Sequence, residues 1–373
     1  LAGNFTSLED RYIFARIWWD KEENKMGKKG RMTRVIYMTN IGTIPDQQGV
    51  IVKDNKGNRV GMLDEGFLEK LDRGDIFILG GNSYQFNYAR GMVAQVTPMP
   101  GKKPTVPSWY SDRLPLSYDL AKGIQHFRKL MEEKFRKKRK KEEIISFINE
   151  YLYVDEIAAE ALYNYFKAQF DYIGIPHEKK LIVEHYRDEA MKNYVVFHTL
   201  YGRRVNDALS RALAYAIARS QHKDVEIGIS DNGFYVSYDR NVNVNKAFSL
   251  LKSKEFEKVL KLAIDKSEVL KRRFRHCAGR ALMILRNYGG KRKRVGRQQV
   301  SSMILMSAVR RISDKFFILE ETRREILEDL MDMKGAHEIL EGIENKKIKV
   351  EEVVTFIPSP FALNLIMQGY SDI

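Results

Sequence analysis

Five of the nine prolines in this sequence fall within 18 residues, between Pro98 and Pro115. Proline fixes the backbone angle φ and has no N–H to donate, so this segment suits neither the interior of a helix nor a central strand. We interpret residues 98–116 as an extended connector. Because the sequence patterns on its two sides differ, the connector divides the chain into a β-rich part and a mainly helical part.

The part before the connector, residues 1–97, has the pattern of a β-rich module. The segment GVIVKDNKGNRVGML predicts a hairpin that turns at residues 55–58. DIFILGGNSYQFNYARGMVAQVTPM predicts further short strands with glycine turns, and EGFLEKL predicts a short helix between them. KGRMTRVIYMTN fits either a helix or a strand.

The part after the connector begins with a helical segment, residues 117–176, with Ser117 as N-cap and a stop at Gly174 and Pro176. Residues 177–245 then predict a ββαββ unit. Its second hairpin, VEIGISDNGFYVSYD, contains an Asn-Gly pair, which is a strong signal for a tight turn. Such a unit forms an antiparallel sheet with a helix on one face.

Residues 246–373 show helical patterns to the end and are predicted to be a helical C-terminal region. The predicted fold class is therefore α+β. It combines a β-rich N-terminal module, including a small barrel-like part, with a helical domain that contains the ββαββ sheet.

Composition favours a folded protein, because 44% of the 373 residues are hydrophobic and 30% are charged. No run approaches the roughly 18 apolar residues of a membrane span, so no membrane partner is expected. The single cysteine, Cys277, excludes an intrachain disulfide and a cysteine-based zinc site, and it favours a reducing, cytoplasmic location. The two ends are compatible with a fragment of a longer protein.

The net charge of +15 is concentrated in one block. Residues 269–313 contain 13 Lys and Arg and no acidic residue, while the other 51 basic residues nearly balance the 49 acidic ones. A charge concentrated in this way attracts polyanions. A basic face that serves only solubility usually mixes both signs of charge, so the block favours contact with nucleic acid.

The pattern within this block predicts a helix, a basic loop and a second helix. KRRFRHCAGRALMILRNY forms an amphipathic helix in which Arg272, Arg275 and Arg286 lie opposite the apolar side, and Gly289-Gly290 end it. Residues 291–297 form the basic loop, and QQVSSMILMSAVRRI restarts a helix. The run RKKRKK at 136–141 is followed by two glutamates, so a solvated face is at least as good an interpretation there.

Catalytic motifs are not evident in the sequence. An ATPase needs the phosphate-binding motif GxxxxGK[ST] and an acidic metal-binding strand, and neither occurs. We therefore expect no cofactor in this chain and no ATP hydrolysis by it alone. His177, His185 and His198 lie near one predicted hairpin but lack the spacing of a metal site.

Six stretches, in this order, resemble the C-terminal half of the Lhr-type (large helicase-related) superfamily 2 helicases, particularly the archaeal members. They are IGTIPD (41–46), GFLEKLDRGDIFILGGNSYQF (66–86), PTVPSWYSDRLPLSYDL (104–120), YGRRVNDALSRALAYAIA (201–218), ISDNGFYV (229–236) and RFRHCAGRALMILRNYGGKRKRVGRQQV (273–300).

This resemblance implies a winged-helix region followed by a C-terminal domain that assists an ATP-dependent 3′–5′ DNA or RNA helicase. The two RecA-like lobes that bind ATP and magnesium in that family have no counterpart in the chain. The resemblance places Ile44 and Trp109 along the tracking strand, with Trp109 stacking on a base. The residues that we expect to contact nucleic acid are Ile44, Trp109, Arg203, Arg204, Arg272, Arg275, Arg280, Arg286, Lys291, Arg292, Lys293, Arg294, Arg297 and Gln298.

Two other functions stay open at this point. The basic block is also suited to docking an acidic protein, such as a ribonuclease or a replication or repair factor. A nuclease or glycosylase activity of the chain itself is a third hypothesis, although no group of residues argues for it. The sequence does not distinguish DNA from RNA, and it does not give the oligomeric state.

Overall fold

The computed structural model describes residues 17–367 apart from 29, 31, 43–48, 64, 69–70, 72, 91–92, 103–113, 190, 239–241, 266, 286, 289–290 and 293–294. The chain divides into two compact units. The first comprises residues 1–109 and 266–326, and the second comprises residues 110–265 and 327–372. Each unit is thus built from separate stretches of sequence, whereas the sequence pattern predicts five consecutive segments. Those finer divisions stay a prediction.

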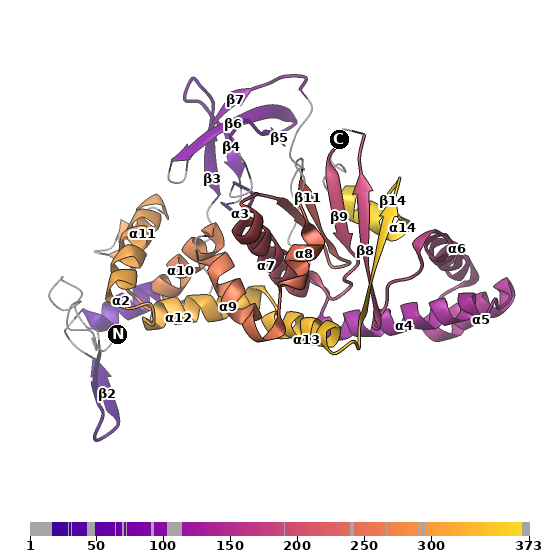
Figure 1. Cartoon of the computed structure of the whole chain (residues 1–373). Helices are drawn as coiled ribbons and strands as arrows, with labels where there is room; N and C mark the ends of the chain where they lie inside the picture. Colours follow the sequence, from indigo (N-terminus) through magenta and orange to yellow (C-terminus); the bar gives the residue numbers. More distant parts are fainter. Residues whose placement is uncertain are drawn as a thin grey trace. The chain divides into compact units, whose positions relative to one another are not determined.

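The first unit contains a curled five-stranded sheet with the order β4-β3-β7-β6-β5 (Figure 1). Its pairs are antiparallel except β3 with β7, and the short helix α3 follows β4. Val50, Val52, Phe77 and Val96 are buried in its core. The elements are β3 Val50–Lys53, β4 Arg59–Leu63, α3 Glu65–Leu68, β5 Ile76–Leu79, β6 Asn82–Arg90 and β7 Val93–Pro98. The hairpin predicted around residues 55–58 is confirmed as β3–β4.

The described part of the first unit also holds two two-stranded hairpins, β1–β2 and β12–β13, and a group of helices. The segment that was ambiguous in the sequence is helical, since α2 covers most of it. Helices α10, α11 and α12 pack around Phe274, Val309, Phe316 and Leu319, which are buried. The elements are β1 Ile17–Asp20, β2 Lys25–Lys28, α2 Thr33–Asn40, α10 Glu268–Arg280, β12 Asn287–Tyr288, β13 Lys291–Arg292, α11 Val295–Ile312 and α12 Phe317–Arg324. The π-helical η1 Glu325–Leu330 begins in this unit and continues into the second unit from residue 327.

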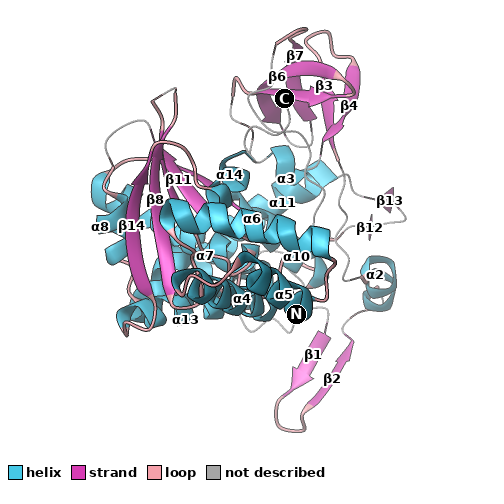
Figure 2. Cartoon of the chain, turned by 90° about the vertical axis from the view of Figure 1, so that its right-hand side faces the viewer, coloured by secondary structure: helices cyan, strands magenta, loops and turns pink. Residues whose placement is uncertain are grey.

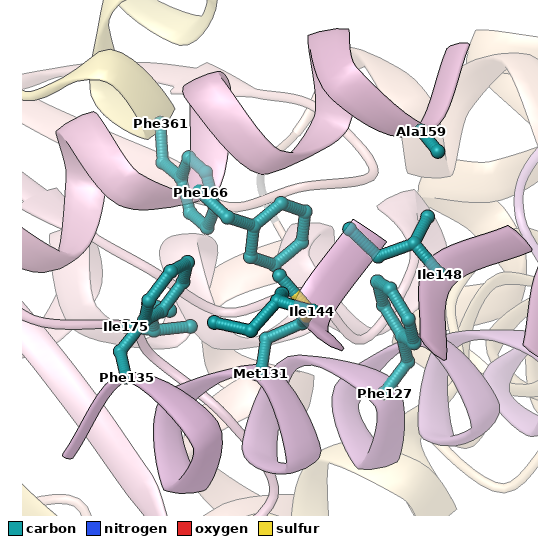
Figure 3. Close-up of a cluster of buried hydrophobic side chains, with 9 residues drawn as sticks. All are labelled: Phe127, Met131, Phe135, Ile144, Ile148, Ala159, Phe166, Ile175 and Phe361. Atoms are coloured by element: carbon teal, nitrogen blue, oxygen red, sulfur yellow. The ribbon is translucent and has the colours of Figure 1, made fainter. Parts of the chain in front are cut away.

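Three helices of the second unit enclose an aromatic core. Figure 3 shows Phe127 and Phe135 from one helix and Phe166 from another turned toward the same interior. The helices are α4 Tyr118–Arg136, α5 Lys141–Leu152 and α6 Glu156–Ile173. The helical segment that the sequence predicts is broken between α4 and α5, because Lys138 adopts a left-handed φ of 51°. Ser117 caps α4 as predicted, by accepting a hydrogen bond from the Leu120 N–H.

The second unit contains a five-stranded sheet with the order β10-β11-β9-β8-β14. Val196 and Phe197 are neighbours on β9 and therefore point to opposite faces. On one face, α14 packs around Val196, and on the other Phe248 of α8 contacts Phe197 at 5.1 Å between ring centroids. The strands are β8 Lys180–Arg187, β9 Asn193–Phe197, β10 Glu226–Ile229, β11 Phe234–Tyr238 and β14 Lys349–Thr355. The helices are α7 Arg203–Gln221, α8 Val244–Ser249, α9 Ser253–Ile264, α13 Met333–Glu344 and α14 Pro360–Met367.

Both predicted hairpins of the ββαββ unit are confirmed, as β8–β9 and β10–β11. The expectation of helices alone after residue 245 was wrong in two places, since β12 and β13 form a short hairpin and β14 joins the sheet parallel to β8. Figure 2 shows β14 at the edge of the sheet. With a mixed sheet, helices and the curled N-terminal sheet, the α+β fold class is confirmed.

Candidate nucleic-acid interface

Helix α10 carries the first part of the basic block. Its N-terminus is capped by Ser267, whose hydroxyl accepts a hydrogen bond from the Leu270 N–H at 3.3 Å. The helix ends at Arg280, because Leu282 adopts a left-handed φ of 57°. The Met283 N–H then bonds back to the Ala278 carbonyl at 3.0 Å. The predicted helix that continues to residue 288 was therefore wrong, and the sequence offers no glycine or asparagine at position 282 to signal the stop.

The apolar side of α10 is buried as its pattern predicts. Phe274, Cys277 and Ala278 belong to the helical core of the first unit. Arg275, however, is only 7% exposed, so the expectation that it lies on an outward arginine face was wrong. Arg272 is partly exposed and stays a candidate for contact with a ligand.

Glu325 lies against the arginines of α10, although it comes from η1, outside the acid-free block. Its carboxylate forms an ion pair with Arg273 at 3.3 Å and a close one with Arg280. The Glu325 side chain is 4% exposed, while those of Arg273 and Arg280 are 21% and 36% exposed. Part of the positive charge of α10 is therefore neutralised within the fold. Sequence reasoning missed this feature because Glu325 lies outside the block and 45 residues after Arg280.

A short β-hairpin, β12–β13, follows α10 where the sequence pattern predicted the end of a helix and a basic loop. Asn287 pairs with Arg292 and Tyr288 with Lys291. A Gly-Gly pair between two strands is a known hairpin signal, so this hairpin could have been predicted from the sequence. The backbone of Asn287 is bound by Asn40 of α2, which anchors the hairpin to that helix.

The hairpin and the start of α11 hold four of the remaining candidates. Lys291 and Arg292 form β13, and Arg297 and Gln298 lie in the first turn of α11; the structure describes only the backbone of these four. The other candidates, Ile44, Trp109, Arg286, Lys293 and Arg294, lie outside the described residues.

Two candidates lie in the second unit, at the start of α7. Arg203 is exposed, and its backbone N–H donates to the Asp231 carboxylate at 2.8 Å. The Arg204 guanidinium donates to the backbone carbonyls of Glu328 and, at 3.2 Å, Met331. The side chain of Arg204 thus binds the end of η1 within its own unit.

The histidines that the sequence placed near one hairpin do not converge. Among the residues that the structure describes, no three His, Cys, Asp or Glu side chains come together to hold a metal ion. His177 instead bonds Glu132 at 2.7 Å, and His198 bonds Glu184 at 2.8 Å. Burial raises the pKa of Glu132, but hydrogen bonds from His177 and Lys180 outweigh it and bring that pKa to about 2.

Glu184 binds three elements of the second unit together. Besides His198, it accepts hydrogen bonds from the Thr355 hydroxyl at 2.9 Å and from the Ser359 N–H at 2.7 Å. Burial raises its pKa, but these bonds, with that of His198 the strongest, leave it lowered. Glu184 is fully buried and therefore has a structural role rather than a catalytic one.

Comparison with known proteins identifies the family. The family described as DEAD/H associated matches residues 175–362, and the winged helix domain of large helicase-related protein matches residues 5–106. The ATP-dependent helicase Lhr-Core of Methanothermobacter thermautotrophicus is 52% identical over the whole chain, which covers 43% of that protein. The chain belongs to the Lhr family. The resemblance in the sequence is thus confirmed.

Other Lhr proteins match a similar share of this chain and of their own length. ATP-dependent helicase Lhr-Core protein 2 of Thermococcus barophilus is 42% identical over the whole chain, which again covers 43% of the relative. A structure of Mycobacterium smegmatis helicase Lhr bound to ssDNA and AMP-PNP matches 94% of this chain and 40% of its own, with a TM-score of 0.68 and 22% identity. That likeness describes the fold alone. The chain spans less than half the length of these Lhr relatives, and it corresponds to their C-terminal part.

Within the described ranges, no helix of this Lhr chain combines the length and the apolar character that crossing a bilayer requires.

Proposed function

We propose that this chain is the nucleic-acid-binding accessory part of an Lhr-type helicase. In this proposal it holds a single strand while RecA-like lobes outside the chain hydrolyse ATP with a magnesium ion and drive 3′–5′ movement. The relatives named ATP-dependent helicases support the assignment, as does the fold shared with an Lhr protein whose structure contains ssDNA. A cytoplasmic location stays a prediction.

The observation that carries the proposal is the concentration of positive charge in the first unit. Of the 13 basic residues between 269 and 313, ten lie on α10, β13 and α11, and the other three lie outside the described residues. Glu325 neutralises part of this charge on α10, so the hairpin and the start of α11 are the better candidates for phosphate contact. Lys and Arg side chains on these two elements would contact the phosphate backbone of the nucleic acid. Such contacts provide affinity without reading the base sequence.

The proposal gives the candidate residues different roles. We expect Lys291, Arg292 and Arg297 to bind phosphates, and the resemblance to Lhr-type helicases leads us to expect that Trp109 stacks on a base. Arg204 and Arg275 are expected to contribute through the fold, because one binds backbone carbonyls and the other is buried.

Salt-dependent binding tests the proposal directly. The whole chain is titrated against a fluorescent single strand of about 20 nucleotides, as DNA and as RNA, and the affinity is measured between about 50 and 200 mM salt. We expect the affinity to fall steeply with salt. For the double variant Lys291→Ala and Arg292→Ala, the slope of log K against log salt should shrink by about 0.7 for each phosphate that is no longer neutralised.

The matched control removes two charges from the other basic run. Lys137 and Lys140 are exposed, flank the break between α4 and α5, and can be replaced by alanine together. This pair should leave both the affinity and the salt slope nearly unchanged. An affinity that is independent of salt, or an equal drop in affinity for the control, would contradict the proposed interface.

A further inference from the structure

The exposed edge of β14 is a second surface that the proposed function does not use. In the described sheet, β14 is the outermost strand and pairs only with β8, in parallel register from Lys349 opposite Lys180 to Thr355 opposite Tyr186. Figure 2 shows this strand at the sheet edge. An unpaired edge presents backbone N–H and C=O groups to which another strand can bind.

The hydrogen bonds between β14 and β8 show which backbone N–H and C=O groups of β14 are available to pair with another strand. The Lys349 N–H donates to the Lys179 carbonyl at 2.9 Å. Because successive residues of a strand direct their backbone groups to alternate sides, Glu351, Val353 and Thr355 also face β8. The N–H and C=O groups of Val350, Glu352 and Val354 consequently face outward, and the Val354 side chain is 84% exposed.

A cavity of about 320 Å³ lies beside this edge. Val350 and Glu352 of β14 line it from one side, and residues of β8, α8, α13 and the turn before α9 line the rest. Its apolar wall consists of Val183, Phe248, Leu251, Leu340, Ile343 and Val350. This volume is near the lower end for ligand pockets, about 300 Å³, and has room for one large apolar side chain.

The rim of the cavity is acidic on balance. It carries Glu344 and Glu352 against the single base Lys252. Hydrogen bonds from the Ser253 hydroxyl at 2.6 Å and the Ser253 N–H at 2.9 Å fix Glu344 and lower its pKa, so it is charged at neutral pH. In a chain of net charge +15, an acidic rim disfavours phosphate and favours basic side chains.

We propose that this edge and cavity bind an extended segment of a partner protein, which adds to the sheet beside β14. Main-chain hydrogen bonds to Val350, Glu352 and Val354 supply affinity, as in other complexes formed by strand addition. Because alternate side chains of the segment face the cavity, one large apolar residue enters it. Lys or Arg two residues before and after that apolar residue meet Glu344 and Glu352. The expected motif is basic-x-apolar-x-basic.

Selection from a display library of random nine-residue peptides tests this surface. The whole chain is the target, and the Val354→Pro chain is used for counter-selection. Proline is tolerated on an edge strand where its missing N–H faces solvent, so this variant should keep the sheet and block strand addition. Val354→Thr is the matched control, because it preserves both the N–H and the β-branched shape.

A second variant closes the cavity without touching the edge. Ser249 is exposed and lines the cavity, so Ser249→Trp places an indole at its mouth. We expect enriched peptides to share the basic-x-apolar-x-basic alternation. Their Kd should rise at least tenfold with either Val354→Pro or Ser249→Trp and stay the same with Val354→Thr. Amide exchange at Glu352 and Val354 should slow on binding.

Three results would overturn the inference. One is the absence of any peptide that distinguishes the wild-type chain from Val354→Pro. Another is enrichment of peptides that bind Val354→Pro and Ser249→Trp as tightly as the wild type. The third is a dimer of the chain itself that Val354→Pro dissociates, measured by sedimentation, because the edge would then belong to a second copy.

Discussion

The side chain of Asn40 forms two hydrogen bonds with the backbone of Asn287, which is 247 residues away in sequence. Its Nδ2 donates to the Asn287 carbonyl at 3.1 Å, and its Oδ1 accepts from the Asn287 N–H at 2.7 Å. Asn40 is 2% exposed, so these bonds are shielded from water. This pair joins the end of α2 to the β12–β13 hairpin, and therefore fixes the base of the element that we propose to contact phosphate.

Asn40→Ala should loosen the hairpin. Removing the side chain leaves the N–H and C=O of Asn287 without their partners, at a cost of about 1–3 kcal/mol. We expect faster amide exchange at Asn287 and a lower melting temperature of the first unit. Asn345→Ala removes an exposed asparagine of the second unit and should change neither. Unchanged exchange at Asn287 would show that the pair does not hold the hairpin.

Glu325→Gln should destabilise the first unit through the arginines of α10. The change removes the negative charge that Arg273 and Arg280 share, while the amide keeps the shape of the side chain. Breaking a buried ion pair costs about 3–5 kcal/mol. We expect the lower end, ~3 kcal/mol, because both arginines retain partial access to water. Denaturant unfolding measures the decrease in stability.

Glu320→Gln is the control for that experiment, since Glu320 is an exposed glutamate of α12. It should change the free energy of unfolding by less than about 0.5 kcal/mol. Equal stability of the Glu325→Gln and wild-type chains would mean that the ion pairs contribute nothing net.

Much of the fold was predictable because its signals are local. The Asn232-Gly233 turn and the alternation around it identify the β10–β11 hairpin, and Ser117 identifies the start of α4. β14 was missed because a parallel edge strand is defined by its distant partner β8 and not by a turn. Its own segment, KVEEVVT, has two adjacent glutamates that interrupt the alternation.

The candidate site was less predictable, for two physical reasons. The end of α10 depends on Leu282, whose backbone adopts the left-handed conformation. Residue propensities do not predict this conformation for a leucine. The charge on α10 depends on Glu325, which only the tertiary fold brings to Arg273 and Arg280. By contrast, the Gly289-Gly290 hairpin signal was present in the sequence and was interpreted as a helix stop.

Trp109→Ala should weaken single-strand binding without changing the salt slope. Stacking of a base on an aromatic ring contributes about 1–3 kcal/mol, which corresponds to a roughly five- to hundredfold drop in affinity. Because stacking neutralises no phosphate, log K should shift by the same amount at every salt concentration. Trp109→Phe should restore most of the affinity.

Trp18→Ala is the matched control for Trp109. Trp18 lies in β1 and is 47% exposed, so its removal also deletes an accessible indole. We expect the Trp18→Ala chain to bind the single-stranded nucleic acid with an affinity within twofold of the wild-type value. A Trp109→Ala chain that binds as tightly as the wild type would contradict the stacking role.

The stability of the second unit should depend on pH through Glu132. This carboxylate accepts hydrogen bonds from His177 and Lys180, and its pKa in the folded chain is about 2, below the ordinary value of 4.5. A lowered folded pKa stabilises the fold at pH values above the unfolded pKa. That contribution disappears as the pH falls from about 5 toward 2, where the folded carboxylate also becomes protonated.

Glu132→Gln separates this contribution from general acid unfolding. The free energy of unfolding of the wild type and the variant is compared at several pH values between 7 and 2. We expect the wild type to be more stable at neutral pH and the difference to shrink progressively below pH 5, because the glutamine cannot titrate. Glu142→Gln, an exposed change on α5, should give no such pH-dependent difference. A difference that is constant with pH would show that Glu132 stabilises the unit by packing alone.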